Sequence, residues 1–160
     1  MKYLVLSDTH GSTEIVLDLL NAYDGQIDGA IHLGDNSQDM TQYAKDFPGM
    51  AFHAAAGNSG DYGSQEQSLL TLGGRRVFIT HGHRYNVKMN TDRLVYRARE
   101  VEADACLFGH THKPVMFDAG PILFFNPGSP VYPFPGTEPG YGLLHISDYG
   151  VITGEHLKYD

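Results

Sequence analysis

Cysteine is almost missing from this 160-residue sequence, in which Cys106 stands alone. A single thiol cannot form a disulfide within the chain, and it cannot supply the thiolate set that holds a structural zinc ion. Disulfides are typical of proteins in oxidising compartments, so this composition favours the cytoplasm.

Long hydrophobic runs are missing as well. No stretch of about 18 consecutive apolar residues occurs, which excludes a membrane-spanning helix and disfavours a membrane partner. The first strand-like run begins at Lys2, and we therefore expect no signal peptide.

Basic residues are scarce, with eleven Lys and Arg against nineteen Asp and Glu and a formal net charge of −8. Proteins that grip long nucleic acids neutralise phosphates with Lys and Arg side chains, and no basic stretch is present here. The charge therefore disfavours a nucleic-acid polymer as partner, and nuclease activity on polynucleotides with it. A small substrate is favoured, and assembly into a homo-oligomer stays open.

Apolar residues make up 41% of the chain, enough to bury a core, and the length predicts one domain over residues 1–160. Strand-like apolar runs alternate with helical periodicity at first, whereas strands follow one another directly toward the C-terminus. This order predicts an α/β sandwich with mixed sheets and with helices on the outside.

The helical periodicities predict helices over 12–23, 37–46 and 90–103. Ser12 or Thr13 is the expected N-cap of the first helix, and Glu100, Glu102 and Asp104 are interpreted as a solvated face of the last. The expected strands span 2–7, 29–33, 50–56, 67–72, 75–80, 104–108, 114–118, 121–125, 142–147 and 150–157. The pair that flanks Gly73 and Gly74 is predicted to form a hairpin.

Histidine is abundant, with nine residues, and metal-binding side chains follow nearly every early strand. They are Asp8 and His10, Asp35, Asn58, His81 and His83, and His110 and His112. In α/β folds, ligand sites gather beyond the carboxyl ends of parallel strands. We therefore expect these side chains, which lie far apart in sequence, to converge on one metal site.

Seven of these side chains form the candidate ligand set: Asp8, His10, Asp35, Asn58, His81, His110 and His112. Seven are too many for one transition metal, but two ions that share a bridging carboxylate would use them all. Imidazole, carboxylate and amide donors favour manganese, with nickel, iron, zinc or cobalt as alternatives, over calcium or magnesium alone. Two divalent ions exceed the charge of two aspartates, so the site would attract a phosphoester anion.

Each position also has a plainer interpretation. Asp8 and Asp35 could be acidic residues at helix N-termini, and Asn58 could be a turn residue with positive φ; the set as a whole favours ligation. His32 lies inside a strand and is expected to be hydrogen-bonded in the core or behind the ligands. His83 is a candidate to contact the substrate or to donate a proton. His53, His145 and His156 are interpreted as structural or exposed, and the loop 126–130 as a rigid turn that also walls the site.

Five ordered motifs, "SDTHG", "HLGD", "GN", "THGH" and "GHTHKP", together with the late "FNPGSP", span nearly the whole chain. This order resembles the calcineurin-like metallophosphoesterases, and within them the small prokaryotic phosphodiesterase branch. The resemblance implies a four-layer αββα sandwich with a binuclear metal centre at the strand ends.

The resemblance also implies roles for the candidate ligands. Asp35 would bridge the two ions. The first ion would be held by Asp8, His10 and His112, and the second by Asn58, His81 and His110. The implied reaction is in-line attack on phosphorus by a hydroxide that bridges the two metals, with no protein nucleophile.

The sequence departs from the family pattern at three positions. Ser59 stands where many relatives have a histidine that protonates the leaving group, and Ser12 replaces an asparagine. Phe134 follows Pro133 where this branch often has arginine, which removes an expected substrate contact.

A rival interpretation keeps the fold and discards the chemistry. The retromer subunit of the same wider group is a protein-binding scaffold whose ligand positions are altered. Because this chain keeps all seven candidate ligands, the sequence favours the enzyme over the scaffold.

Overall fold

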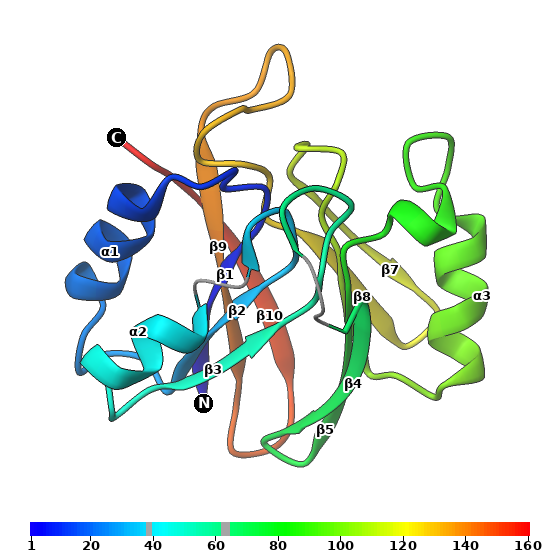
Figure 1. The fold of residues 1–160 in the computed structure, drawn as a ribbon. Helices are drawn as coiled ribbons and strands as arrows, with labels where there is room; N and C mark the ends of the chain where they lie inside the picture. Colours follow the sequence, from blue (N-terminus) through cyan, green and yellow to red (C-terminus); the bar gives the residue numbers. More distant parts are fainter. Residues whose placement is uncertain (38–39, 62–64) are drawn as a thin grey trace.

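Two five-stranded mixed sheets form the centre of the protein (Figure 1). The structure is a computed structural model that describes residues 1–37, 40–61 and 65–160. The first sheet has the order β10-β9-β1-β2-β3. Its strands are β1 (Lys2–Leu6), β2 (Gly29–His32), β3 (Ala51–Ala54), β9 (Gly140–Ile146) and β10 (Ile152–Lys158). The second sheet has the order β4-β5-β6-β8-β7. Its strands are β4 (Gln67–Leu72), β5 (Arg75–Thr80), β6 (Ala105–Leu107), β7 (Val115–Ala119) and β8 (Ile122–Asn126).

Helices cover the outer faces of both sheets. The helices α1 (Thr13–Ala22) and α2 (Met40–Asp46) lie beside the first sheet, and α3 (Asp92–Glu100) lies beside the second (Figure 1). Separate apolar cores fill the space between each sheet and its helices, and a third lies between the two sheets. The expected four-layer αββα sandwich with two mixed sheets is therefore confirmed.

Strand β1 contributes side chains to two of these three cores. Tyr3 and Val5 point into the core between the sheets, whereas Leu4 and Leu6 pack with α1 and α2. All four side chains are buried. A strand buried on both faces reads as a continuous apolar run, because successive side chains point to opposite sides of the sheet.

The β4–β5 hairpin forms as predicted. Leu72 pairs with Arg75, so Gly73 and Gly74 are the two turn residues. Both have positive φ, 56° and 76°, the backbone that a two-residue type I′ turn requires and that glycine adopts without strain.

The structure corrects several element boundaries. Ser12 occupies the N-cap of α1 but makes no side-chain capping bond. The expected helix 37–46 begins at Met40 among the described residues, and 38–39 lie outside them. The helix predicted to reach residue 103 ends at Glu100.

The sequence placed Glu102 and Asp104 on a solvated helix face, and this interpretation is wrong because both residues lie beyond the end of α3. Glu102 has a left-handed φ of 54°, so the chain has already left the helix there. Asp104 Oδ2 accepts a hydrogen bond from the backbone N–H of Arg76 at 2.8 Å, which ties the chain before β6 to β5.

Among the described residues, the helices are too short and too polar for any of them to cross a membrane.

Candidate metal centre

The parallel strands of both sheets bring their carboxyl ends to one edge of the sandwich. In the first sheet β1, β2 and β3 are parallel, and in the second β5, β6 and β8 are parallel. The segments that follow five of these strands carry the candidate ligands predicted from the sequence. The spatial convergence follows from this topology.

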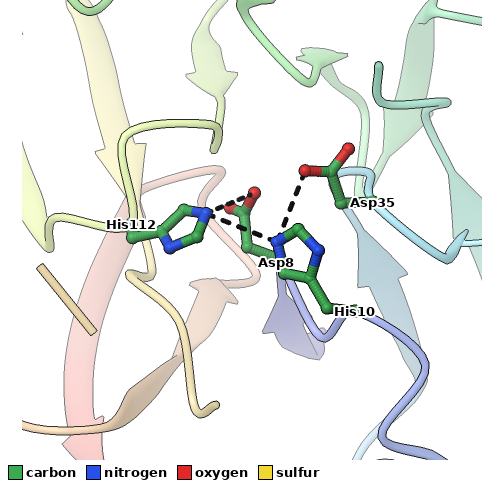
Figure 2. A group of neighbouring side chains, drawn as sticks. All are labelled: Asp8, His10, Asp35 and His112. Atoms are coloured by element: carbon green, nitrogen blue, oxygen red, sulfur yellow. Dashed lines mark hydrogen bonds and ion pairs between the residues drawn. The ribbon is translucent and has the colours of Figure 1, made fainter. Parts of the chain in front are cut away.

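Four of the candidate ligands form a compact cluster: Asp8, His10, Asp35 and His112 (Figure 2). One donor atom from each lies within 4.8 Å of the others. His10 Nε2 is 3.5 Å from Asp35 Oδ2, and His112 Nε2 is 3.3 Å from Asp8 Oδ1. The two Nε2 atoms are 3.5 Å apart, so the four groups face a common point.

A second group adjoins this cluster on the side of β5. His81 Nε2 lies 3.5 Å from Asp35 Oδ1 and 3.1 Å from His110 Nδ1. The two carboxylate oxygens of Asp35 therefore face different groups, Oδ2 toward His10 and Oδ1 toward His81. Asp35 lies between the two sets of imidazoles.

Backbone carbonyls fix the tautomers of two histidines. His81 Nδ1 donates to the carbonyl oxygen of Leu33 at 2.7 Å, and His112 Nδ1 donates to that of Tyr132 at 2.6 Å. Because a carbonyl only accepts, each neutral ring carries its proton on Nδ1 and presents the Nε2 lone pair to the carboxylates. This arrangement is typical of metal-ligating histidines.

The buried carboxylate of Asp8 supports the same conclusion. Oδ2 accepts hydrogen bonds from Ser7 Oγ at 2.6 Å and from the His110 backbone N–H at 3.0 Å. Oδ1 is buried and has no hydrogen-bond partner among the described residues. An unpartnered buried carboxylate oxygen is costly, and a cation beside it would remove that cost. The donor set therefore fits a divalent metal.

Backbone strain is concentrated at this site. Among the described residues, eight non-glycine residues have positive φ, and five of them are candidate ligands: Asp8, His10, Asp35, His110 and His112. Their φ values lie between 47° and 70°. Such conformations are uncommon outside glycine and cluster at functional sites, where the surrounding structure holds them. The strained turns aim each ligand back across the strand ends.

Two glycines leave room for the aspartates. A Cβ on Gly57 would lie 2.2 Å from Asp35 Oδ1, and a Cβ on Gly109 would lie 1.9 Å from Ser7 Oγ and 2.9 Å from Asp8 Oδ2. Any larger residue at these positions would displace the ligand or the group that orients it.

Gly57→Ala should therefore weaken metal binding by about 10- to 100-fold, the loss typical when the groups that position a ligand are disturbed. Metal titration by calorimetry measures this effect. Gly49→Ala is the matched control, because a Cβ there meets nothing within 4 Å and φ is not positive. Equal metal affinity in the two variants would contradict the assigned position of Asp35.

The electrostatics of the metal-free site differ between the two aspartates. Burial opposes ionisation of Asp8, but the His112 ring beside its carboxylate, followed by His81, outweighs burial, so the pKa of Asp8 is lowered. Burial raises the pKa of Asp35, and the nearby Asp8 carboxylate adds to that rise. The adjacent Asp8 carboxylate raises the pKa of His112, whereas burial lowers the pKa of His110 to about 4.

Asn58 and His83 occupy a neighbouring position. Both line a hollow with Gly57, Asp61 and Glu66. Asn58 is exposed. The His83 ring centroid lies 5.4 Å from that of His81, and His83 Nε2 is 3.7 Å from Glu66 Oε1. His83 is thus beside the ligands, and burial lowers its pKa.

Ser59 contributes its backbone to the site. Its N–H donates to Asp35 Oδ1 at 3.0 Å, and the residue is exposed. Next to it, Asp61 accepts from the Ser37 and Gly57 N–H groups at 2.6 and 2.7 Å, which joins the segments after β2 and β3. No sequence motif indicated this role for Asp61, because a single aspartate in a loop has many plain interpretations.

His32 and the late loop support the ligands from behind. Gly34 N–H donates to His32 Nδ1 at 3.1 Å, so Nε2 carries the proton and donates to Thr9 Oγ1 at 2.8 Å. Burial lowers the pKa of His32 to about 4, which keeps it neutral. Ser129 Oγ donates to the Asp8 carbonyl oxygen at 2.9 Å, and Asn126 Nδ2 donates to the Gly109 carbonyl at 3.1 Å. The loop 126–130 is thus bonded to the segments that carry the ligands.

The remaining histidines lie away from this centre. His145 is exposed on β9, and the His53 ring lies 6.4 Å from the ring of Tyr3. The His156 ring stacks on Phe125 at 4.5 Å between centroids, and its Nε2 donates to the Asn126 carbonyl at 2.7 Å.

An αββα sandwich with carboxylates and imidazoles gathered at its strand ends defines the metallophosphoesterase class. Residues 1–149 match the family model described as the calcineurin-like phosphoesterase superfamily domain, and the chain belongs to this superfamily. It is 30% identical over 151 residues to "Probable metallophosphoesterase YsnB" of Bacillus subtilis, covering 92% of this chain and 86% of that protein. It is 37% identical over 78 residues to "Phosphodiesterase YfcE" of Escherichia coli K12, covering 49% of this chain and 39% of that protein.

Solved structures show the same fold. A conserved protein of Streptococcus pneumoniae TIGR4, a predicted phosphoesterase, superposes with a TM-score of 0.83 and 33% identity, covering 98% of this chain and 88% of the other. Vps29 of Entamoeba histolytica complexed with zinc superposes with a TM-score of 0.74 and 24% identity, covering 98% of each chain. The second likeness concerns the fold alone.

Proposed function

We propose that the protein is a metal-dependent phosphodiesterase that binds two divalent transition-metal ions, with manganese the first candidate. The observation that carries the proposal is the position of Asp35, whose two oxygens each lie 3.5 Å from a histidine of a different group. A carboxylate placed between two sets of imidazole donors is suited to bridging two cations.

The proposed ligand sets are those that the family resemblance implies. Asp8, His10 and His112 would hold one ion, and Asn58, His81 and His110 the other, with Asp35 shared between them. The ions would supply Lewis-acid charge to the phosphoryl oxygens and a water molecule acidic enough to attack near neutral pH. Within the chain, Leu33 and Tyr132 carbonyls hold the imidazoles in the ligating tautomer.

The other catalytic roles concern the leaving group. His83, beside His81 in the adjoining hollow, is the candidate to contact the substrate or to donate a proton to the departing oxygen. A phosphodiester is favoured over a monoester because a relative is named a phosphodiesterase. The cytoplasm, proposed from the single cysteine, is the location at which we expect the protein to act.

The alternative function is a protein-binding scaffold of the same fold. Vps29 structures match the whole chain, so the fold alone does not distinguish the two functions. The enzyme is favoured because the carboxylates and imidazoles that would bind metal are all present and four of them already meet within 4.8 Å.

A panel of phosphoesters tested metal by metal distinguishes the alternatives. Purified protein, stripped and then reloaded with Mn, Ni, Fe, Zn or Co, should hydrolyse bis(4-nitrophenyl) phosphate faster than 4-nitrophenyl phosphate. Chelation should abolish both reactions. Metal binding without turnover of either ester, for all five metals, would favour the scaffold.

A further inference from the structure

A large hollow adjoins the metal centre on the side of the second sheet. Its volume is about 710 Å³, and His110 and His112 form part of its wall. Volumes of about 300–1,000 Å³ are typical of sites for small molecules. The hollow and the metal centre therefore share two side chains, so one molecule could occupy both.

The lining of this hollow is mainly apolar. The contributing side chains are Val87, Phe108, Val115, Tyr132, Pro133 and Phe134. Tyr132 and Phe134 are 59% and 41% exposed, so both rings are open to a ligand in the hollow. Both rings lie beside the proposed binding site of a phosphoester anion, so they offer an apolar surface next to a charged one.

The aromatic wall is fixed relative to the ligand histidine. The Phe134 N–H donates to the His112 carbonyl oxygen at 3.1 Å, and His112 Nδ1 donates to the Tyr132 carbonyl at 2.6 Å. Thr137 closes the loop, because its N–H and Oγ1 both donate to the Phe134 carbonyl, at 2.9 and 2.7 Å. These bonds hold the backbone of Tyr132 and Phe134 next to His112, and the loop therefore carries both rings beside the metal centre.

Two lysines place positive charge along the same hollow. Lys113 Nζ lies 5.3 Å from the centroid of the Phe134 ring, and Lys88 lines the wall near His110. Within the described ranges, neither lysine forms an ion pair with a carboxylate. In a chain with a net charge of −8, two unpaired cations beside a phosphoester site favour an anionic ligand there.

We infer that this hollow is the subsite for an aromatic ester group of the phosphodiester substrate, with Tyr132 and Phe134 as its specificity-determining residues. The inference rests on the proposed function for the position of the phosphoryl group. Flat rings favour a planar aromatic group over an alkyl chain, because aromatic pairs gain attraction beyond the area they bury. Lys88 and Lys113 would contact the anionic oxygens of the same molecule.

Binding of inert phosphonates tests the subsite without requiring turnover. Phenylphosphonate, cyclohexylphosphonate and methylphosphonate carry the same anionic group on a P–C bond, so hydrolysis cannot remove them. Calorimetric titration of the manganese-loaded protein should give phenylphosphonate a Kd about tenfold lower than that of methylphosphonate. Cyclohexylphosphonate should bind more weakly than phenylphosphonate.

Variants assign the preference to the proposed residues. Phe134→Ala should remove most of the preference for phenyl over methyl, and Phe134→Leu should remove the preference for phenyl over cyclohexyl. Lys113→Met should weaken all three phosphonates. Tyr149→Ala is the control, because Tyr149 is 93% exposed in the β9–β10 turn, away from the hollow.

The outcomes separate the subsite from the function. Equal binding of phenyl- and methylphosphonate, or a phenyl preference that survives Phe134→Ala, would overturn the subsite even if the protein hydrolyses phosphodiesters. Equal binding of cyclohexyl- and phenylphosphonate would overturn its aromatic character. A phenyl preference lost in Phe134→Ala would support the subsite even if no ester is hydrolysed, and the proposed function alone would then fail.

Discussion

Asp35→Asn should lower kcat/KM for bis(4-nitrophenyl) phosphate by about 10³-fold or more, whereas His83→Ala should lower it by about tenfold. Asp35 faces both groups of imidazoles, so loss of its charge weakens both ions together. Lewis-acid stabilisation by bound metal supplies several kcal/mol, and about 4 kcal/mol corresponds to 10³-fold in rate. His83 lies outside the proposed ligand set, next to Glu66.

The substitution is chosen to leave the fold intact. Asparagine has the shape of aspartate, and its amide oxygen can still accept the Ser59 N–H bond that Asp35 Oδ1 accepts at 3.0 Å. Urea unfolding of the two metal-free variants provides the control for stability. A larger loss for His83→Ala than for Asp35→Asn would show that the division into ligands and neighbours is wrong.

The rate of hydrolysis should fall steeply as the pKa of the leaving group rises. A nitrophenolate departs readily as an anion, but an alkoxide leaves poorly unless it is protonated. The family resemblance implies a histidine where this chain has Ser59, and a serine hydroxyl is too weakly acidic to donate a proton near pH 7. General acids contribute about 10²–10⁴-fold where they are needed, so alkyl phosphodiesters should be turned over more slowly than aryl ones by that order.

Ser59→His should flatten this dependence. Ser59 is exposed, and its backbone already contacts Asp35, so an imidazole at this position would stand at the rim of the metal centre. The measurement is a plot of log kcat/KM against leaving-group pKa for both proteins. A shallow slope for the unaltered protein would indicate a proton donor elsewhere, and His83 would then be the first residue to replace.

The convergence of the candidate metal-binding side chains could be predicted from sequence because they occupy positions that topology brings together. Asp8, Asp35 and His81 each follow a strand by one to three residues, and parallel strands of neighbouring elements end at one edge. The residue types then indicated the chemistry. The orientation of the histidine rings could not be predicted from the sequence. The groups that fix it are the backbone carbonyls of Leu33 and Tyr132, and every residue has such a carbonyl whatever its side chain.

Contacts between segments that are distant in the sequence could not be predicted either. Asp104 looked like the continuation of a helix because local periodicity does not record its bond to Arg76 in β5. The hollow beside His112 depends on a loop folding back so that Phe134 N–H reaches the His112 carbonyl. Phe134 stands where the family resemblance implies an arginine. From the sequence alone this difference indicated only a lost substrate contact, whereas in the structure Phe134 lines the hollow.

Metal content measured together with activity tests the central claim most directly. Protein stripped of metal and dialysed against manganese should hold about two ions per chain by elemental analysis, and activity should rise with occupancy and disappear on chelation. Asp35→Asn should hold fewer ions under the same conditions. Full phosphodiesterase activity in metal-free protein, or undiminished metal content in Asp35→Asn, would contradict a binuclear centre bridged by Asp35.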